Sequence, residues 1–435
     1  MFRTAAAFWM ISVAAFGADF TRDIAPILIS ECLTCHSAEK AKGGYRVHTY
    51  AAVLEPGKSN QPAVVSGKPE GSELYKRLVT HDEDDRMPQD DDPLTAEQIE
   101  IFRNWIAAGA SLDRGEPNSP LASLLPRANY PAPPQFYKRA LPMLALTFTP
   151  DGKQLAVSGH HEITLWSLDG QLQQRITNAP QRVHSISFHP TTNLVAIAGG
   201  KPGRSGEVSI YNNGVFLTNL AQHSDEFLSV AFSPNGNLLA AAGSDNSIRV
   251  FDTKDWGSIT IIQQHADWVT SIAFNPAGDK LVSASRDRTA RIYDASTGEL
   301  ETTYPNHSAA VFSAIFLDED RVASAGRDKS IHIWDIKEGK KRNEISGAEA
   351  DVVELLAAEK FLFAAAANSV RQYKKSDRKL VRTYSGHTAT VFALAFHPES
   401  DRLAAGAFDG SIRIWDTKDG SIVSTFTAAP LNSAQ

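Results

Sequence analysis

The chain has only two cysteines among its 435 residues, which excludes a framework of structural disulfides. No stretch reaches the roughly 20 consecutive apolar residues that a transmembrane helix needs. There is no basic stripe to neutralise phosphates, which argues against nucleic acid as a partner. The sequence also lacks the nucleophile elbow, the His-Glu-x-x-His motif, the P-loop and the dinucleotide fingerprint, so it favours a protein that is not an enzyme.

The two cysteines, Cys32 and Cys35, are followed at once by His36. This spacing is used for covalent attachment of c-type haem, because two thiols can form thioethers with the porphyrin while the imidazole binds the iron. A thioredoxin-like pair, a structural disulfide and a zinc site compete with this interpretation. The surrounding sequence lacks the βαβ context or second ligand pair that thioredoxin or zinc would need. We therefore predict one covalent haem c.

Residues 1 to 18 have the pattern of a signal peptide: a positive charge at Arg3, an apolar run, and small residues at Ala15 and Gly17. We expect the mature chain to be periplasmic or otherwise exported from a bacterium, where haem attachment takes place. A retained N-terminal anchor is the alternative.

The formal charge of −7 is unevenly distributed. Residues 19 to 116 contain 18 acidic and 11 basic side chains, a net of −7, while residues 117 to 435 contain 32 and 31, a net of −1. The segment with the haem motif therefore has nearly all of the negative charge.

Residues 19 to 113 have helical patterns. An apolar helix is expected over residues 23 to 30, a turn at Gly43-Gly44 and a short helix over residues 72 to 79. In the last helix, Thr95 and Gln98 form a capping box and Gly109 occupies the position of a C-terminal cap. The pattern predicts a small all-α module.

A low-spin haem needs a second axial ligand, and Met87 is the only methionine between the signal peptide and Met143. His81, His48 or an open site are the alternatives, and peroxidase-like catalysis would require the open site. The acidic run around Met87 is interpreted as a solvated loop, as a docking face for a basic redox partner or, more weakly, as a calcium site.

These features together resemble the planctomycete-type cytochrome c domain. The resemblance covers the whole first module and rests on residues 19 to 24, the haem motif, Lys42-Gly43-Gly44, residues 69 to 74, Met87-Pro88, residues 93 to 95 and residues 105 to 110. It implies that Cys32, Cys35, His36 and Met87 hold the haem. Ser37 and Gln89 depart from the glycine and proline that are common in the family.

A proline-rich linker is expected over residues 114 to 140, semi-rigid and extended. From residue 141 the chain repeats. An aromatic residue before a turn recurs every 39 to 45 residues, at Trp166, Tyr211, Phe251, Tyr293, Trp334, Tyr373 and Trp415. Seven such units with strand-like alternation predict a seven-bladed β-propeller over residues 141 to 428.

The units resemble WD repeats, in which a histidine, a hydroxyl, an aspartate and a tryptophan form a buried hydrogen-bond chain. The fifth blade matches best, with His307, Ser324, Asp328 and Trp334. The fourth has His265, Ser283 and Asp287 but ends in Tyr293, and the seventh has His387, Asp409 and Trp415 but Ala405 in place of the hydroxyl. The first, second and sixth blades lack most of the set and are expected to rely on packing.

Residues 136 to 141 or 421 to 427 are expected to supply the strand that closes the ring. His160 and His161 are interpreted as a surface pair, unless they face the haem. The sequence thus predicts an exported c-type cytochrome that transfers single electrons and docks a redox partner through its propeller. The alternative is an interaction scaffold that binds protein or glycan, with the haem in a sensing or accessory role.

Overall fold

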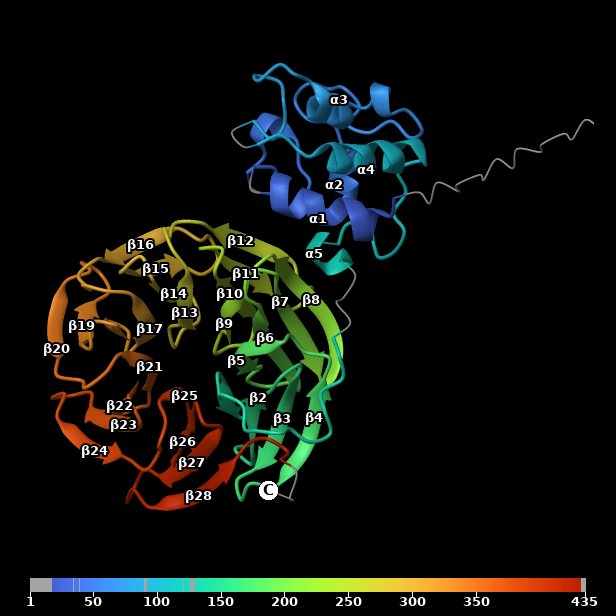
Figure 1. The fold of residues 1–435 in the computed structure, drawn as a ribbon. Coiled ribbons are helices and arrows are strands. Elements are labelled where there is room, and N and C mark those ends of the chain that lie inside the picture. The colour runs from blue at the N-terminus through green and yellow to red at the C-terminus, as the bar shows by residue number, and fades with distance from the viewer. Residues whose placement is uncertain are drawn as a thin grey trace, which may run out of the picture. The chain divides into compact units, whose positions relative to one another are not determined.

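The structure, a computed structural model, describes residues 18–33, 35–38, 40–89, 92–119, 121–125 and 130–431. The chain divides into two units, residues 1–126 and 127–435, which Figure 1 shows in blue to teal and in green to red. Apart from Ala18, the expected signal peptide lies outside the described residues. None of the described helices has the length and apolar character that crossing a membrane requires.

The N-terminal unit consists of short helices and long loops. Its helical segments are η1 (Phe20–Ile24), α1 (Ala25–Ile27), η2 (Leu28–Cys32), η3 (Lys42–Gly44), α2 (Tyr50–Leu54), η4 (Pro69–Gly71), α3 (Glu73–Val79), α4 (Ala96–Ala107) and α5 (Leu121–Leu124). The described part of the unit contains no strand, but α4 is its only helix of more than seven residues. The expectation of an all-α module is therefore met only in part.

The helix α4 begins and ends as its sequence predicts. The Thr95 hydroxyl accepts a hydrogen bond from the Gln98 backbone, and the Gln98 side chain accepts one from the Thr95 backbone. At the other end Gly109 has a φ of 111°, and the Ala110 amide donates to the Trp105 carbonyl, five residues earlier. These caps hold the buried face of the helix against the continuous helical segment of η1, α1 and η2.

Part of the expected linker packs on the N-terminal unit. The Leu121 amide donates to the His48 carbonyl, and Leu121 and Leu124 are buried in the core of this unit. Further along, Tyr130 and Tyr137 are bonded to the second unit, through the Asn178 side chain and the Pro430 carbonyl. Residues at both ends of the proline-rich segment are thus bonded to the unit that they adjoin, whereas Phe136, between Tyr130 and Tyr137, is 48% exposed.

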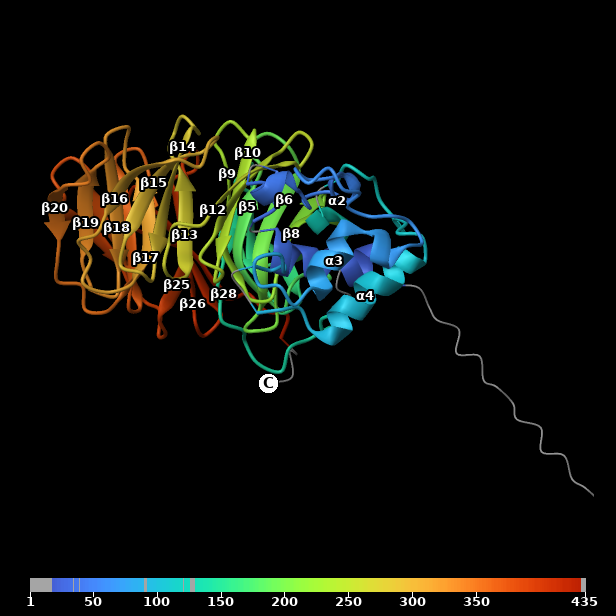
Figure 2. The same ribbon diagram turned by 90° about the horizontal axis from the view of Figure 1, so that it is seen from above.

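The second unit is a ring of seven four-stranded antiparallel sheets around one axis (Figures 1 and 2). The first four blades contain β1 (Leu146–Phe148), β2 (Gln154–Ser158), β3 (Glu162–Ser167), β4 (Leu172–Thr177); β5 (Arg182–Phe188), β6 (Leu194–Lys201), β7 (Ser205–Asn212), β8 (Val215–His223); β9 (Phe227–Phe232), β10 (Leu238–Gly243), β11 (Ile248–Asp252), β12 (Ser258–Ile262); and β13 (Val269–Phe274), β14 (Lys280–Ser285), β15 (Ala290–Asp294), β16 (Leu300–Tyr304). The other three contain β17 (Val311–Phe316), β18 (Arg321–Gly326), β19 (Ile331–Asp335), β20 (Lys341–Ile345); β21 (Val352–Ala357), β22 (Phe361–Ala366), β23 (Ser369–Lys374), β24 (Leu380–Tyr384); and β25 (Val391–His397), β26 (Arg402–Ala407), β27 (Ser411–Asp416), β28 (Ile422–Thr427).

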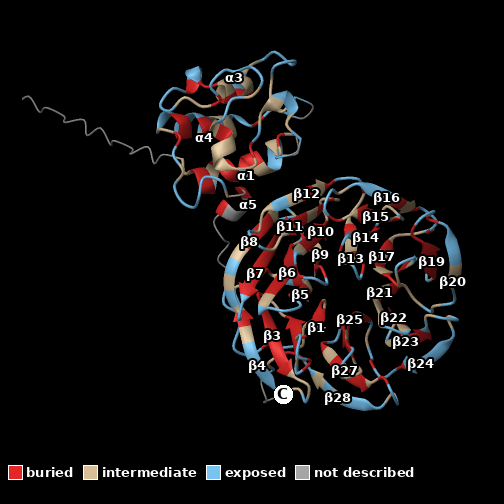
Figure 3. Cartoon of the chain, turned by 180° about the vertical axis from the view of Figure 1, so that it is seen from behind, coloured by how far each residue is buried: buried red, intermediate tan, exposed pale blue. Residues whose placement is uncertain are grey.

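The seven repeating aromatic residues all lie on the third strand of a blade, so the repeat read from the sequence is the structural repeat. Their side chains are buried between neighbouring sheets. In Figure 3 the middle strands are mostly buried and the outermost strands mostly exposed. The second strand of each blade is buried along nearly its whole length, so each sheet is packed on both faces and the polar residues are concentrated at the outer rim.

Hydrogen bonds between blades run along the inner strands. A serine in each of four inner strands accepts the amide of a residue in the next inner strand at 3.1 to 3.2 Å: Ser185 in β5, Ser229 in β9, Ser271 in β13 and Ser313 in β17. In β21 the same position is Glu354, whose Oε2 accepts the Leu394 amide of β25 at 2.5 Å. In five of the seven blades, one side chain of the inner strand thus satisfies a backbone donor in the inner strand of the next blade.

The ring closes without exchange of a strand between its ends. Of the two segments expected to supply the closing strand, Ile422–Thr427 forms β28, but it completes the seventh blade and does not join the first. Residues 136 to 141 contribute one isolated parallel bridge, between Tyr137 and Leu431. The first and last blades are held by packing, since Met143 and Leu146 share a core cluster with Ile412.

Candidate functional site

The haem motif occupies the end of the first helical segment and the turn that follows it. The amides of Cys35 and His36 both donate to the Cys32 carbonyl, at 3.2 and 3.0 Å. One turn of backbone therefore carries both thiols and the imidazole. The cysteines are not joined to each other.

Cys32, His36 and Met87 line one cleft of about 220 Å³ in the N-terminal unit. Its walls are largely apolar, with Val47, Leu74 and Leu78 among the lining residues. Basic side chains also contribute to the lining: Lys42, Lys58 and Arg77. The structure thus brings together three of the four predicted site residues, while Cys35 lies on the adjoining turn and is not part of the lining.

The His36 ring is oriented by Tyr45. His36 Nδ1 lies 3.1 Å from the Tyr45 carbonyl oxygen, which can only accept, so the proton is on Nδ1 and Nε2 carries the lone pair. The Tyr45 ring packs edge-on against the imidazole, with the ring centroids 5.6 Å apart, and its hydroxyl donates to the Val53 carbonyl at 2.8 Å. In metal-binding histidines, the ring nitrogen that does not bind the metal commonly donates to a backbone carbonyl, and this bond orients the ring.

Burial raises the pKa of the Cys32 thiol to about 12, with smaller contributions from Glu31 and Cys35. The thiol is therefore protonated at neutral pH. A thioredoxin-like pair requires a thiolate and hence a lowered pKa, so this environment disfavours that reading. It does not bear on thioether formation, which leaves no free thiol.

Arg77 on α3 holds the loop that contains Met87. Its carbonyl accepts the Met87 amide at 2.9 Å, and its guanidinium donates to the Asp85 carboxylate at 3.0 Å and to Glu73 at 2.9 Å. The same residue also lines the cleft. Backbone and side chain of one arginine thus place the methionine beside the cleft.

The alternative axial ligands, His48 and His81, do not line the cleft. Both residues are described, and neither is among those that form its walls. Residues 82 to 85 are exposed, as a solvated loop requires, but Asp85 forms the ion pair with Arg77. The run is therefore in part a structural element of the methionine loop.

These observations fit a haem. The cleft offers an apolar wall for the ring, a histidine oriented through Nδ1, a thioether, a cysteine and basic side chains for the two carboxylates that haem carries. Cys32, Cys35, His36 and Met87 are the residues that would hold it.

In the propeller, the predicted hydrogen-bond chain of the fifth blade is confirmed. His307 contacts Asp328 through Nδ1 and Ser324 through Nε2, both at 2.7 Å, and Trp334 donates to Ser324 at 3.0 Å. In the fourth blade His265 contacts Asp287 and Ser283 at 2.8 and 2.7 Å.

The seventh blade departs from its expected pairing. His387 Nδ1 contacts the Ser411 hydroxyl at 2.9 Å, while Asp409 accepts from Ser411 and from Thr388. Because Ala405 supplies no hydroxyl, His387 Nε2 has no partner among the described residues. Burial lowers the pKa of His387 to about 4, so the ring is neutral at pH 7.

The first, second and sixth blades use other polar pairs and do not rely on packing alone. Trp166 donates to Thr164 at 2.8 Å, the Ser209 hydroxyl donates to Glu207 at 2.8 Å, and the Tyr384 hydroxyl donates to Gln372 at 2.8 Å. Buried polar atoms need partners, and each of these blades finds them locally.

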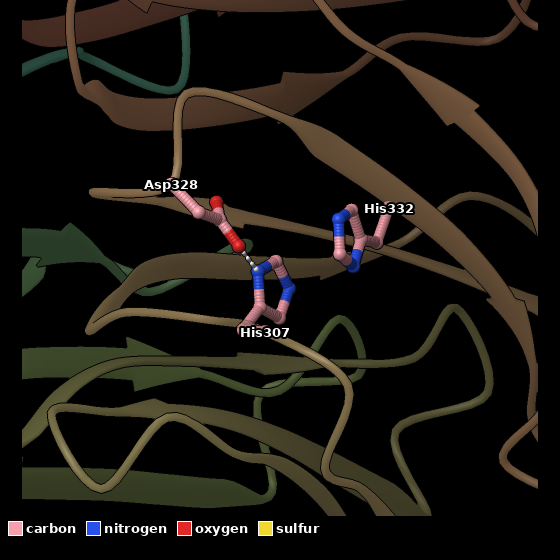
Figure 4. A group of neighbouring side chains, drawn as sticks. All are labelled: His307, Asp328 and His332. Carbon is pink, nitrogen blue, oxygen red and sulfur yellow. Dashed lines mark hydrogen bonds and ion pairs between the residues drawn. The ribbon is translucent and has the colours of Figure 1, made fainter.

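Within the described residues, one group of His, Cys, Asp and Glu is close enough to share a metal ion: His307, Asp328 and His332. Figure 4 shows the two imidazoles face to face, with Asp328 hydrogen-bonded to His307. Their planes are 11° apart and their centroids 4.1 Å apart. Nitrogen lone pairs lie in the ring plane, and both nitrogens of His307 are already engaged, so this group is part of the blade structure and not a metal site.

The pair His160 and His161 is likewise structural, and the expectation of a surface pair is wrong for His161, which is buried. Its Nδ1 contacts the Ala179 carbonyl at 3.2 Å and its ring stacks on Tyr130 at 5.1 Å. The Tyr137 hydroxyl oxygen lies 3.2 Å from the His160 carbonyl oxygen and donates to the Glu162 carboxylate at 2.6 Å. The pair therefore contacts Tyr130 and Tyr137, in the segment before the first strand of the second unit.

Both units match known families. Residues 32–91 match the model of planctomycete cytochrome C. Residues 214–252, 256–294, 298–335 and 378–416 match the WD domain, G-beta repeat, and these segments end at the third strands of the third, fourth, fifth and seventh blades. The chain carries a planctomycete-type cytochrome c domain followed by a seven-bladed WD-repeat propeller.

Curated proteins resemble segments of this chain. The chain is 27% identical over 114 residues to the serine-threonine kinase receptor-associated protein of Gallus gallus, which is 26% of this chain and 32% of that protein. It is 32% identical over 72 residues to WD repeat-containing protein 75 of Mus musculus, 16% of this chain and 9% of that protein. It is 43% identical over 49 residues to the COMPASS component SWD3 of Saccharomyces cerevisiae, 11% of this chain and 16% of that protein. The chain thus spans a third or less of the length of these relatives.

Sequence reasoning did not identify Tyr45 and Arg77. Tyr45 acts through its backbone carbonyl, which no residue type signals. Arg77 lies on α3 between Leu74 and Leu78, the two residues that identified the apolar face of this helix. The available signal was an arginine next to such a face, ten residues before the methionine.

Proposed function

We propose that the N-terminal unit binds one haem covalently through Cys32 and Cys35, with His36 and Met87 as axial ligands, and that the protein is an exported electron carrier. The observation that supports this most directly is the orientation of His36 by the Tyr45 carbonyl, in a cleft that also contains Cys32 and Met87. When bound, haem supplies a one-electron iron couple. The remaining tasks belong to the chain: the Tyr45 carbonyl orients His36, Arg77 places the methionine, and the apolar walls exclude water.

Expression of the full chain with a bacterial haem-attachment system tests covalent binding. We expect a mass increase equal to one haem that persists after denaturation, and its loss in the double variant with both Cys32→Ser and Cys35→Ser. A wild-type chain that loses its haem on denaturation would contradict the covalent assignment.

The sixth ligand is tested by spectroscopy of the ferric protein. We expect a low-spin spectrum with a sulfur-to-iron charge-transfer band in the wild type and no such band in Met87→Ala. Met143→Ala, which changes a methionine in the core of the second unit, is the matched control and should keep the band. A band that persists in Met87→Ala would show that another residue is the ligand, and peroxidase turnover by the wild type would favour an open site.

The propeller supports a second role as a docking platform for protein partners. One of the relatives, SWD3 of Saccharomyces cerevisiae, is named as a component of COMPASS. In the alternative function the propeller is the main functional part and the haem is a sensor or accessory. Electron transfer to a soluble acceptor, measured in the full chain by stopped-flow spectroscopy, separates the two. Rapid transfer that slows with ionic strength favours the carrier with a charged docking face.

A further inference from the structure

The loops at one end of the fourth and fifth blades have a charge pattern that the blade structure does not require. The turn between the second and third strands reads Arg286-Asp287-Arg288 in the fourth blade and Arg327-Asp328-Lys329 in the fifth. In both turns the aspartate points inward to the histidine of its hydrogen-bond chain, as Figure 4 shows for Asp328. The cations on either side remain exposed.

The two turns are connected through the inner strands. The Arg286 amide donates to the Trp268 carbonyl, and the Arg327 amide donates to the Ala310 carbonyl, both just before an inner strand. The Thr270 hydroxyl of one inner strand then donates to the Val311 carbonyl of the other at 2.7 Å. The basic side chains of neighbouring blades therefore share one surface, at the end of the ring where the inner strands begin.

Few acidic groups neutralise this surface. Arg286 lies over the Trp268 ring at 4.4 Å and has Asp267 at 3.7 Å. The Lys329 ammonium contacts only the carbonyl of Glu349, whose carboxylate pairs with Arg371. Within the described part of the chain, the side chains of Arg288 and Arg327 have no partner.

The equivalent turns elsewhere are different. They read Ser244-Asp245-Asn246 in the third blade and Phe408-Asp409-Gly410 in the seventh. These blades fold with the same aspartate and without flanking cations. The four cations are therefore not needed for the propeller, although the second unit as a whole has a nearly balanced charge.

We infer that the surface formed by Trp268, Arg286, Arg288, Arg327 and Lys329 binds an acidic segment of a partner protein. Unpaired guanidinium groups bind carboxylates in a forked geometry, and the Trp268 ring with Arg286 over it adds a flat platform to the same surface. Clustered positive charge also accelerates the approach of an acidic partner. This inference rests on the proposed docking role of the propeller, and it does not depend on the haem ligands.

The test uses the full-length protein and a fluorescein-labelled peptide of ten glutamates, with fluorescence anisotropy as the readout. A ten-lysine peptide is the control for non-specific association. We expect the glutamate peptide to bind the wild type, with an affinity that falls as salt is added. Arg288→Gln combined with Arg327→Gln should weaken binding about five- to tenfold, since each exposed ion pair contributes a modest free energy.

The matched control is Lys254→Gln, an exposed cation in the turn between β11 and β12, at the opposite end of the ring. It should leave the affinity unchanged. An equal loss in this control, or no preference for glutamate over lysine, would overturn the inference. A phosphoserine peptide that binds more than about tenfold tighter than glutamate would replace it with phosphate recognition.

The haem absorbance and the circular dichroism of each sample are recorded in the same cell. Failure of the inference then appears as lost peptide selectivity with an intact haem spectrum. Failure of the proposed function appears as an altered spectrum with unchanged peptide binding.

Discussion

Glu354 makes the stability of the propeller depend on pH, because it is the one carboxyl in a position that four other blades fill with serine. Burial raises its pKa from the ordinary 4.5 to about 8, against the smaller opposing effect of the Leu394 amide. Between these values the unfolded chain has lost the proton that the folded chain keeps. The free energy of unfolding therefore falls as the pH rises through this range and is fully retained below pH 4.5.

The magnitude follows from the width of that range. One unit of pKa difference corresponds to about 1.4 kcal/mol, so three pH units give at most about 4 kcal/mol. The side chain is only partly removed from solvent, and we therefore expect about half, or about 2 kcal/mol, between pH 5 and pH 8. Glu354→Gln keeps an acceptor for the Leu394 amide and cannot ionise.

The assay is urea denaturation of the full chain at pH 5, 6.5 and 8, with the β-sheet transition followed by far-ultraviolet circular dichroism. The stability of Glu354→Gln relative to the wild type should rise from near zero at pH 5 to about 2 kcal/mol at pH 8. Glu359→Gln, an exposed glutamate of the same blade, is the control and should show no such rise. A stability difference that is the same at all three pH values would refute the reasoning.

Three further substitutions test local structure. Arg77→Gln removes the ion pair with the methionine loop, and the charge-transfer band of the ferric protein should weaken while that of an Arg103→Gln control does not. Tyr137→Phe deletes a donor to the buried Glu162 carboxylate at 2.6 Å and should lower propeller stability by about 1 to 2 kcal/mol in urea; no change would mean that the bond is not formed. Thr95→Ala removes a helix cap and should cost about 1 kcal/mol in thermal denaturation, with Thr95→Ser as the rescue variant.

Much of the fold could be predicted because it depends on local patterns. The helix caps at Thr95 and Gly109 are satisfied by neighbours within a few residues, and the structure confirms both. The aromatic repeat gave the number of blades, since each blade is built from consecutive strands. The weakest blades were also identified correctly: the first, second and sixth are those without a match to the WD model.

The errors have two causes. Ring closure depends on packing between segments that are distant in sequence. The partner of His387 and the polar pairs of the weaker blades depend on side chains without a family counterpart. Ser411 could not be assigned to His387 from spacing, because the expected partner Asp409 is only two residues away. The ring of Tyr130, which lies 31 residues earlier in the sequence, stacks on His161 and helps to bury it.

The sequence by itself determined the chemistry available to the protein: two cysteines and a histidine in one turn, one methionine nearby, and seven repeats. These are properties of short segments, and short segments encode local geometry. Only the tertiary structure decided that Cys32, His36 and Met87 line one cleft, that a backbone carbonyl orients the histidine, and that the cations of two blades share a surface. Each of these depends on packing between segments that the sequence does not place side by side.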